Sequence, residues 1–169
     1  MKKGQEENII KGMYIFQQGG KGSKRVQLMG SGSILREVIA AANILAEDFG
    51  IQADVWSCPS FNELKRDGDD CVRWNLMHPD QKPRIPHVTA CLEKHSGPVV
   101  AATDYVKLFA DQIRAYVGRN FHVLGTDGFG RSDTRASLRR HFEVNRYYVT
   151  VAALKTLADE GTIPAKTVK

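Results

Sequence analysis

Short apolar runs alternate with amphipathic stretches along this chain, and that alternation predicts a β-sheet covered by helices. Strands are predicted where apolar side chains dominate a run of five to seven residues, at Met13–Gln17, Val26–Gly30, Ala53–Ser57, Pro98–Asp104 and Phe121–Gly125. The glycine-rich stretch at residues 18–25 is typical of a turn between the first two runs. We therefore expect those two strands to pair antiparallel.

Helices are predicted between and after these strands. Apolar residues from Ile34 to Phe49 recur at three- and four-residue spacing, which places them on one helical face, and Gly50 follows as a stop signal. Ser60 and Glu63 have the spacing of a capping box, so another helix is expected to begin there. Further helices are predicted at His87–His95, Tyr105–Gly118, Ser132–Phe142 and Asn145–Gly161, and three prolines favour extended chain at residues 77–86.

The order of these elements predicts an α/β fold, with a mostly parallel sheet, right-handed crossovers, one antiparallel edge strand and helices on both faces. A chain of 169 residues is long enough for one domain with its own hydrophobic core. No internal repeat or long linker divides the sequence. Residues 1–12 are accordingly expected to be an N-terminal extension or linker, and residues 13–169 to form the domain.

Composition narrows the class of protein. Apolar residues make up 42% of the chain, which is ordinary for a globular domain, and no apolar run approaches the ~20 residues that cross a bilayer. The first twelve residues contain lysines but lack the apolar stretch of a secretion signal. We expect a cytoplasmic protein with neither a membrane span nor extensive disorder.

The net charge of +5 invites a nucleic-acid hypothesis, but acids interrupt the basic residues along most of the chain. The basic cluster is Arg135–His141, and no RNA- or DNA-reading motif accompanies it. Cys58, Cys71 and Cys91 are odd in number and lack the CxxC or Cys/His spacing of a zinc site. They are expected to be reduced thiols without metal, as in cytosolic proteins.

Other familiar chemical motifs are missing or incomplete. The turn at Met29–Leu35 joins a strand to a helix, where phosphate can bind, but the dinucleotide fingerprint would need a third glycine at Leu35 and a later acid. Neither a GxSxG elbow, nor a GxxxxGKS/T loop, nor a histidine pair at metal spacing occurs. The acidic run Asp67–Asp70 is expected to be a solvated turn between helices. Five histidines are expected at the surface or in packing roles: His78, His87, His95, His122 and His141.

The stretch Gly125–Arg135 is the strongest candidate site, because it follows the last strand at the carboxyl edge, where open α/β sheets carry functional loops. Its glycines permit unusual backbone conformations, and its acids would repel a diphosphate. Mixed charges favour paired hydrogen bonds to another protein surface. The candidate interface residues are Gly125, Asp127, Gly128, Gly130, Arg131, Ser132, Asp133 and Arg135. A simpler alternative is a helix entry capped by Ser132 or Asp133, with solvated arginines.

Four segments carry a resemblance to a known family: VQLMGSGSILREV, SFNELKRDGDDCVRWNLMHP, ATDYVKLFADQIR and VLGTDGFGRSDTRASLRRHFEV. Together they closely resemble the C-terminal domain of the homodimeric, bacterial-type pyruvate dehydrogenase, the acetyl-transferring first component of its complex. The resemblance extends from about Glu6 to the end of the chain. It implies a transketolase C-terminal-type fold, with a mixed five-stranded sheet between helices.

The same resemblance implies a function that this chain would serve only within a larger enzyme. The family's full-length homodimer uses thiamine diphosphate and magnesium to decarboxylate pyruvate, and it acetylates the lipoyl group of the dihydrolipoamide acetyltransferase component. Those cofactors bind between two preceding domains, through a GDG motif with a downstream Asn and an activating Glu. Residues 66–70, RDGDD, do not match that motif. We therefore expect no catalytic, cofactor-binding or metal residues here, and a non-catalytic assembly role beside the remaining domains and a second subunit.

Two hypotheses from other classes stay open. An independent small α/β nucleotide-binding domain would use the turn at Gly30–Ser33 and would show ligand affinity on its own. An adaptor or nucleic-acid module would use the cluster Arg135–His141, and its binding would weaken steeply with salt.

Overall fold

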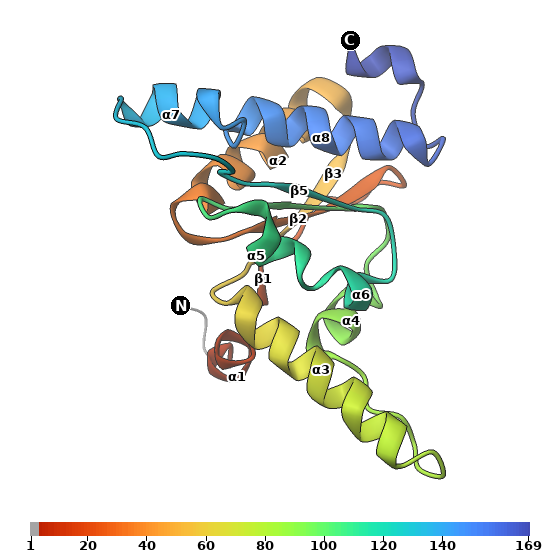
Figure 1. Cartoon of the computed structure of the whole chain (residues 1–169). Coiled ribbons are helices and arrows are strands. Elements are labelled where there is room, and N and C mark those ends of the chain that lie inside the picture. Colours follow the sequence, from red (N-terminus) through yellow and green to blue (C-terminus); the bar gives the residue numbers. More distant parts are fainter. Residues whose placement is uncertain (1–3) are drawn as a thin grey trace.

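A computed structural model describes residues 4–169 and has a five-stranded mixed sheet at its centre (Figure 1). The strands are β1 (Tyr14–Gln17), β2 (Arg25–Gly30), β3 (Gln52–Ser57), β4 (Val99–Ala102) and β5 (Phe121–Leu124). Their order across the sheet is β1-β3-β2-β4-β5, with β1 antiparallel to β3 and the other pairs parallel. The predicted fold class is confirmed, including the antiparallel edge strand.

The predicted pairing of the first two strands is wrong. β1 lies against β3, whereas β2 is enclosed by β3 and β4. The intervening residues 18–24 pass the first residues of β3. There the Gly19 amide donates to Asp54 Oδ1 at 2.9 Å, and a Cβ on Gly19 would lie 2.8 Å from the Ala53 carbonyl oxygen. Glycine is needed here for a close approach of two backbones, not for a hairpin turn.

Helices cover both faces of the sheet (Figure 1). One face carries α2 (Leu35–Phe49) and α8 (Arg146–Asp159), with α7 (Arg135–His141) preceding α8. The other face carries α3 (Phe61–Met77), α4 (His87–Leu92), α5 (Lys107–Asp111) and α6 (Arg114–Val117). The remaining elements are short: α1 (Glu6–Ile10), η1 (Gly32–Ile34) and η2 (Ala165–Val168).

Successive side chains of the central strands enter two different cores. Leu28 and Val55 belong to the core beneath α2 and α8, whereas their neighbours Met29 and Trp56 belong to the core on the opposite face. Side chains alternate between the faces of a strand, so a strand that is covered on both faces is apolar throughout. This burial explains why the strands are visible as mainly apolar runs in the sequence, with the buried Gln27 and Asp54 as polar exceptions in β2 and β3.

Helix boundaries agree with the sequence where a cap fixes them. α2 is followed by Gly50 in the left-handed conformation, with φ of +63°. The Ser60 side chain accepts a hydrogen bond from the Glu63 amide at 3.1 Å, which confirms the predicted start of α3. The Ser60 amide donates to the Gly12 carbonyl oxygen and the Glu63 carboxylate pairs with Arg66, so only half of the capping box forms.

Two predicted boundaries on the α3 face are wrong. The acidic run Asp67–Asp70 lies inside α3 rather than in a turn. Gly68, which resembled a turn residue, allows the helix to pack closely against the ring of Tyr116. A Cβ on Gly68 would lie 2.3 Å from Cε2 of that ring. The helix predicted at Tyr105–Gly118 is divided into α5 and α6, and Ile113 at the break is fully buried in the core.

A buried carboxylate joins the start of β3 to its surroundings. Asp54 is 2% exposed, and its oxygens accept hydrogen bonds from the Gly19 amide at 2.9 Å and Gln27 Nε2 at 3.0 Å. It also pairs with the Arg25 guanidinium at 2.7 Å and with His95 Nδ1 at 2.9 Å. Burial alone would raise the pKa of Asp54, but these hydrogen bonds, that from His95 foremost, hold it below its usual value.

This network predicts a loss of stability in acid. A carboxylate with a lowered folded pKa contributes fully above its unfolded pKa of about 3.9, and the contribution is lost as the pH falls from there through the folded pKa. Asp54→Asn should cost about 2 kcal/mol at neutral pH and flatten the acid limb of the stability curve. Urea unfolding between neutral pH and about pH 3 measures both effects. Asp48→Asn, at an exposed position of α2, is the control. The prediction would be contradicted if the Asp54→Asn variant lost as much stability between neutral pH and about pH 3 as the unsubstituted chain does.

Candidate functional site

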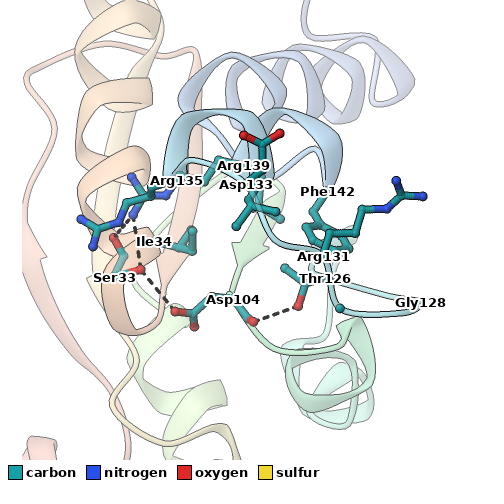
Figure 2. A pocket seen from close by; sticks show the side chains of 13 residues that line it. Ser33, Ile34, Asp104, Thr126, Gly128, Arg131, Asp133, Arg135, Arg139 and Phe142 are labelled. Carbon is teal, nitrogen blue, oxygen red and sulfur yellow. Dashed lines mark hydrogen bonds between the residues drawn. The ribbon is translucent and has the colours of Figure 1, made fainter.

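The strand order creates a crevice at the carboxyl edge of the sheet. The crossover after β2 leads to β3 on one side, and the crossover after β4 leads to β5 on the other. Such a switch point leaves an opening outside the carboxyl ends of the two central strands, and open α/β sheets bind ligands at this place. A pocket of about 450 Å³ is found here (Figure 2).

Residues that follow three parallel strands line this pocket. Ser33 and Ile34 follow β2, Asp104 follows β4, and the β5–α7 loop, residues 125–134, supplies much of the rim. The apolar part of the lining consists of Ile34, Leu138, Phe142 and Val144. The pocket is therefore a crevice with apolar walls and a charged rim, assembled from segments that lie far apart in the sequence.

The three glycines of the β5–α7 loop differ in what the fold requires of them. Gly125 packs against the β4–α5 connection, where a Cβ would lie 2.7 Å from the Tyr105 carbonyl oxygen. Gly128 has φ of +96°, a conformation that side chains disfavour. Gly130 does not have a left-handed backbone, and a Cβ added there would have no atom within 4 Å. The fold thus requires glycine at the first two positions only.

Hydrogen bonds fix the base of the loop to the β4–α5 connection. The Thr126 amide donates to the Tyr105 carbonyl oxygen at 2.8 Å, and the Thr126 hydroxyl donates to the Asp104 carbonyl oxygen at 2.8 Å. Asp127 accepts from the Lys107 amide at 2.8 Å, at the start of α5, and its carboxylate also lies 3.7 Å from Lys107 Nζ. Asp127 therefore serves the internal structure of this edge.

The far end of the loop leads into α7. Thr134 caps this helix by accepting from the Ser137 amide at 3.3 Å, so the predicted caps at Ser132 and Asp133 are wrong. Asp133 instead accepts from the adjacent Thr134 amide at 2.6 Å. The cap lies two residues after Ser132 and one after Asp133, and helix α7 begins at Arg135.

A buried glutamate anchors α7 to the rest of the domain. Glu37 is 7% exposed on its side chain and accepts from the Arg139 guanidinium at 2.9 Å and from the Arg146 amide at 2.9 Å. Arg146 Nε lies 3.0 Å from the same carboxylate. The hydrogen bond from the Arg146 side chain is the main cause that holds the pKa of Glu37 below its usual value. α7 itself contributes no buried residue, so these polar contacts position it.

Four charged side chains that line the pocket form no ion pair within residues 4–169: Asp104, Arg131, Asp133 and Arg135. Arg131 and Arg135 are exposed, and neither forms an ion pair or a hydrogen bond to a side chain or carbonyl within residues 4–169. Asp104 Oδ2 accepts from the Ser33 hydroxyl at 3.2 Å, and the other nearby acids are engaged as described. Figure 2 shows the Arg131 side chain extending away from the pocket. The hydrogen bonds from the Ser33 hydroxyl and the Thr134 amide orient Asp104 and Asp133 but leave their negative charges in place, so the rim carries both signs of charge.

The structure brings together only part of the candidate set. Gly128, Gly130, Arg131, Asp133 and Arg135 line the pocket. Gly125 and Asp127 form the base of the loop beneath it, and Ser132 lines a smaller neighbouring cavity of about 310 Å³. Sequence reasoning missed the apolar lining and three polar lining residues from other segments: Ser33, Asp104 and Arg139. Their signal was positional, since Ser33 and Asp104 lie within three residues of the ends of the parallel strands β2 and β4.

The turn after β2 does not present free amides to a phosphate. A Cβ on Gly30 would lie 2.9 Å from Leu35 Cα, so this glycine permits close packing of strand against helix. The Ser31 amide donates to the Ala102 carbonyl oxygen at 3.2 Å, and the Ile34 amide donates to the Ser31 carbonyl oxygen at 3.3 Å. These contacts favour the structural interpretation of this turn over a nucleotide site.

Other chemistry finds little support in the described part of the chain. Residues 4–169 contain no group of three or more His, Cys, Asp or Glu side chains placed to hold a metal ion. Nor do they include a helix with the length and apolar character of a membrane span. The three cysteines are free. Burial raises the pKa of the Cys58 thiol and raises the pKa of Cys91 to about 11, which disfavours a reactive thiolate.

Residues 12–145 match the model of the transketolase-like TK C-terminal domain, and the chain belongs to this family. Solved transketolases share its fold. A split-gene transketolase, described as an inactive β4 tetramer, superposes with a TM-score of 0.61 at 15% identity, over 88% of this chain and 43% of that one. A transketolase from Pichia stipitis superposes with a TM-score of 0.59 at 20% identity, over 92% of this chain and 19% of that one. At these identities the likeness shows the fold alone.

Relatives of much higher identity are pyruvate dehydrogenase E1 components. The protein of that name from Cupriavidus necator is 59% identical over 165 residues, which are 96% of this chain and 18% of the relative. Those from Pseudomonas aeruginosa and Escherichia coli K12 are 58% and 54% identical, over 99% of this chain and 19% of their own lengths. The resemblance found in the sequence is confirmed, and the chain spans about a fifth of the length of these relatives.

Proposed function

We propose that this chain is the C-terminal domain of a pyruvate dehydrogenase E1 component and has an assembly role rather than a catalytic one. The observation that carries the proposal is its identity of 54% to 59%, over nearly its whole length, to relatives of which it spans 18% to 19%. In this proposal the full-length enzyme decarboxylates pyruvate and acetylates the lipoyl group of the dihydrolipoamide acetyltransferase component. Residues 13–169 form the domain, and residues 1–12 lead into it.

The proposal assigns thiamine diphosphate and magnesium to other domains. Forming a carbanion on the thiazolium ring requires a water-excluding cleft, a carboxylate directed at the aminopyrimidine and a metal that neutralises the diphosphate. The pocket of this chain is lined largely by exposed side chains, and residues 4–169 contain no group of three or more His, Cys, Asp or Glu side chains placed to hold a metal ion. The residues present do not fit a metal diphosphate.

The β5–α7 loop supports the assembly role. Its base is fixed by Thr126 and Asp127, while its tip holds Phe129 in solvent with 95% of the residue exposed. A large apolar side chain on a rigid base suits contact with another protein surface. In the proposed cytoplasmic homodimer, the loop faces the remaining domains or the second subunit.

The assembly role is tested by placing this chain in the longer polypeptide. A chimaera in which these 169 residues replace the matching segment of the Cupriavidus necator relative is compared with the same polypeptide lacking that segment. Sedimentation and pyruvate decarboxylation with thiamine diphosphate and magnesium are measured. We expect an active dimer from the chimaera and loss of the dimer on deletion.

The isolated chain supplies the matched control for catalysis. It should unfold cooperatively, yet calorimetric titration should detect no thiamine diphosphate binding of micromolar affinity. Micromolar binding by the isolated chain would overturn the non-catalytic role. An unchanged dimer after deletion would overturn the assembly role.

A further inference from the structure

Large apolar side chains are exposed on two adjoining segments at the carboxyl edge of the sheet. Those of the first segment, residues 104–109, are Tyr105, Val106, Leu108 and Phe109, with exposed fractions from 39% to 72%. The second segment, residues 125–135, carries Phe129. Single exposed apolar residues are ordinary, but several on one edge are typical of an interaction surface. We refer to these two segments together as the edge surface.

The base of the edge surface is held in place by contacts between its two segments. Its two segments are bound to each other by the hydrogen bonds of Thr126 and by the contacts of Asp127 with Lys107. The rings of Tyr105 and Phe109 are also in contact, with centroids 5.1 Å apart. A preorganised surface loses little conformational entropy when it binds, which favours a docking role.

The edge surface carries two arginines that are available to pair with a carboxylate. Asp104, Asp127 and Asp133 all accept hydrogen bonds within the domain. Arg131 and Arg135 are exposed and form no ion pair with residues 4–169. The planar guanidinium groups match a carboxylate in two parallel hydrogen bonds. A partner that complements this surface therefore carries an acid close to apolar side chains.

We infer that the edge surface docks a segment of the longer polypeptide outside these 169 residues, and that this segment presents a carboxylate beside large apolar side chains. The inference rests on the proposed function. About four-fifths of the length of each relative lies outside the matched region, so the occupant is available in the same polypeptide. Covalent linkage supplies it at high effective concentration.

The geometry favours a protein segment over a small free anion. A phosphate site needs cationic groups that converge on one point, but Arg131 extends away from the pocket (Figure 2). Asp104 and Asp133 also line the cavity itself. Guanidinium groups distributed along a rim fit an extended partner better than a compact ion.

The occupant is identified by photo-crosslinking in the chimaera. Phe129→benzoylphenylalanine places the reactive group at the exposed tip, and mass spectrometry maps the crosslinked peptide. We expect a peptide from outside the 169 residues that contains Asp or Glu and large apolar residues. Crosslinks only to the 169 residues of a second copy, or none at all, would overturn the inference.

Charge reversal tests the role of arginine. In the chimaera, amide exchange of residues 125–135 should be at least about tenfold slower than in the isolated chain, and Arg135→Glu should abolish that difference. Arg73→Glu, on the exposed surface of α3, is the matched control and should leave the protection unchanged. Equal effects of the two reversals would contradict docking through the edge surface. Phe129→Ser tests the apolar part in the same way, with Leu76→Ser, 77% exposed on α3, as its control.

The small-anion alternative and the proposed function have separate outcomes. Inorganic phosphate that protects residues 125–135 in the isolated chain, and does so only with Arg135 present, would replace this inference with an anion site. Deletion of the domain could remove the dimer while Arg135→Glu leaves the amide protection unchanged and the crosslinker at position 129 captures no peptide from outside the 169 residues. The proposed function would then stand, and the edge surface would not be the docking site. If deletion has no effect on the dimer, the proposed function itself fails.

Discussion

Gly97→Ala is expected to destabilise the domain more than any other substitution proposed for it. Gly97 has φ of +92°, and a Cβ there would lie 1.9 Å from the Arg25 carbonyl oxygen and 2.6 Å from its carbonyl carbon. The obstacle is main chain at the start of β2, where Arg25 is paired with Gln52 of β3 and the nearby Gln27 amide donates to the Pro98 carbonyl oxygen, so that it cannot rotate aside. Left-handed strain and overpacking together should cost about 4 kcal/mol, a large share of the stability of a domain of this size.

Gly118→Ala separates the two causes. Gly118 has φ of +68° but no atom within 4 Å of a built Cβ, so alanine there brings backbone strain without a collision. This variant should remain folded and lose only about 1 kcal/mol. Soluble yield, circular dichroism and urea unfolding compare the two variants. Equal losses would show that the chain beside Gly97 relaxes freely and that the collision has no weight.

Glu37→Ala is expected to have the next largest effect on stability. The substitution leaves the Arg139 and Arg146 guanidinium groups close together without their shared carboxylate. Removing one partner of a buried ion pair strands the other charge, and the partial exposure of Arg146 reduces the cost to about 2 to 3 kcal/mol. Amide exchange in α7 should accelerate more than exchange in α2, because α7 has no buried side chain to hold it.

Glu47→Ala is the control for the stability and exchange measurements on Glu37→Ala, because Glu47 lies on α2 like Glu37. Glu47 is exposed, so its loss should change the free energy of unfolding by less than about 0.5 kcal/mol. Chemical denaturation and hydrogen exchange of both variants give the comparison. If α7 keeps its protection in Glu37→Ala, the helix is held by contacts other than this ion cluster, and our account of its position is wrong.

The sequence predicted strands better than it predicted their partners. Strand positions follow from local chemistry, since Leu28 and Met29 must both be apolar when the two faces of β2 are buried. The partner of a strand depends on which other strands bind the same edge. Because β3 and β4 occupy both edges of β2, β1 cannot pair with β2. The glycines at residues 18–22 resemble a turn, although Gly19 serves a close passage of backbone. Gly68 likewise misled the prediction, because its contact with Tyr116 exists only in the folded domain.

The candidate site was predictable in place but not in composition. A glycine-rich loop after the last parallel strand indicated the correct edge. Ser33, Asp104 and Arg139 could not be assigned to it, because their mutual hydrogen bonds join residues 71 and 106 positions apart. The pairing of Asp127 with Lys107 could not be predicted from the sequence either. It engages within the domain an acid that the sequence analysis had assigned to an interface with another protein.

The absence of buried side chains from α7 has an evolutionary consequence. A helix that contributes nothing to either core is free from the volume constraints that limit substitution elsewhere. Provided that Arg139 keeps its carboxylate partner and Thr134 its capping role, the exposed residues 129–137 can diverge to suit a new neighbour while the sheet and its covering helices remain the same. Differences among relatives that assemble differently should therefore concentrate in this segment, whereas the strands drift slowly.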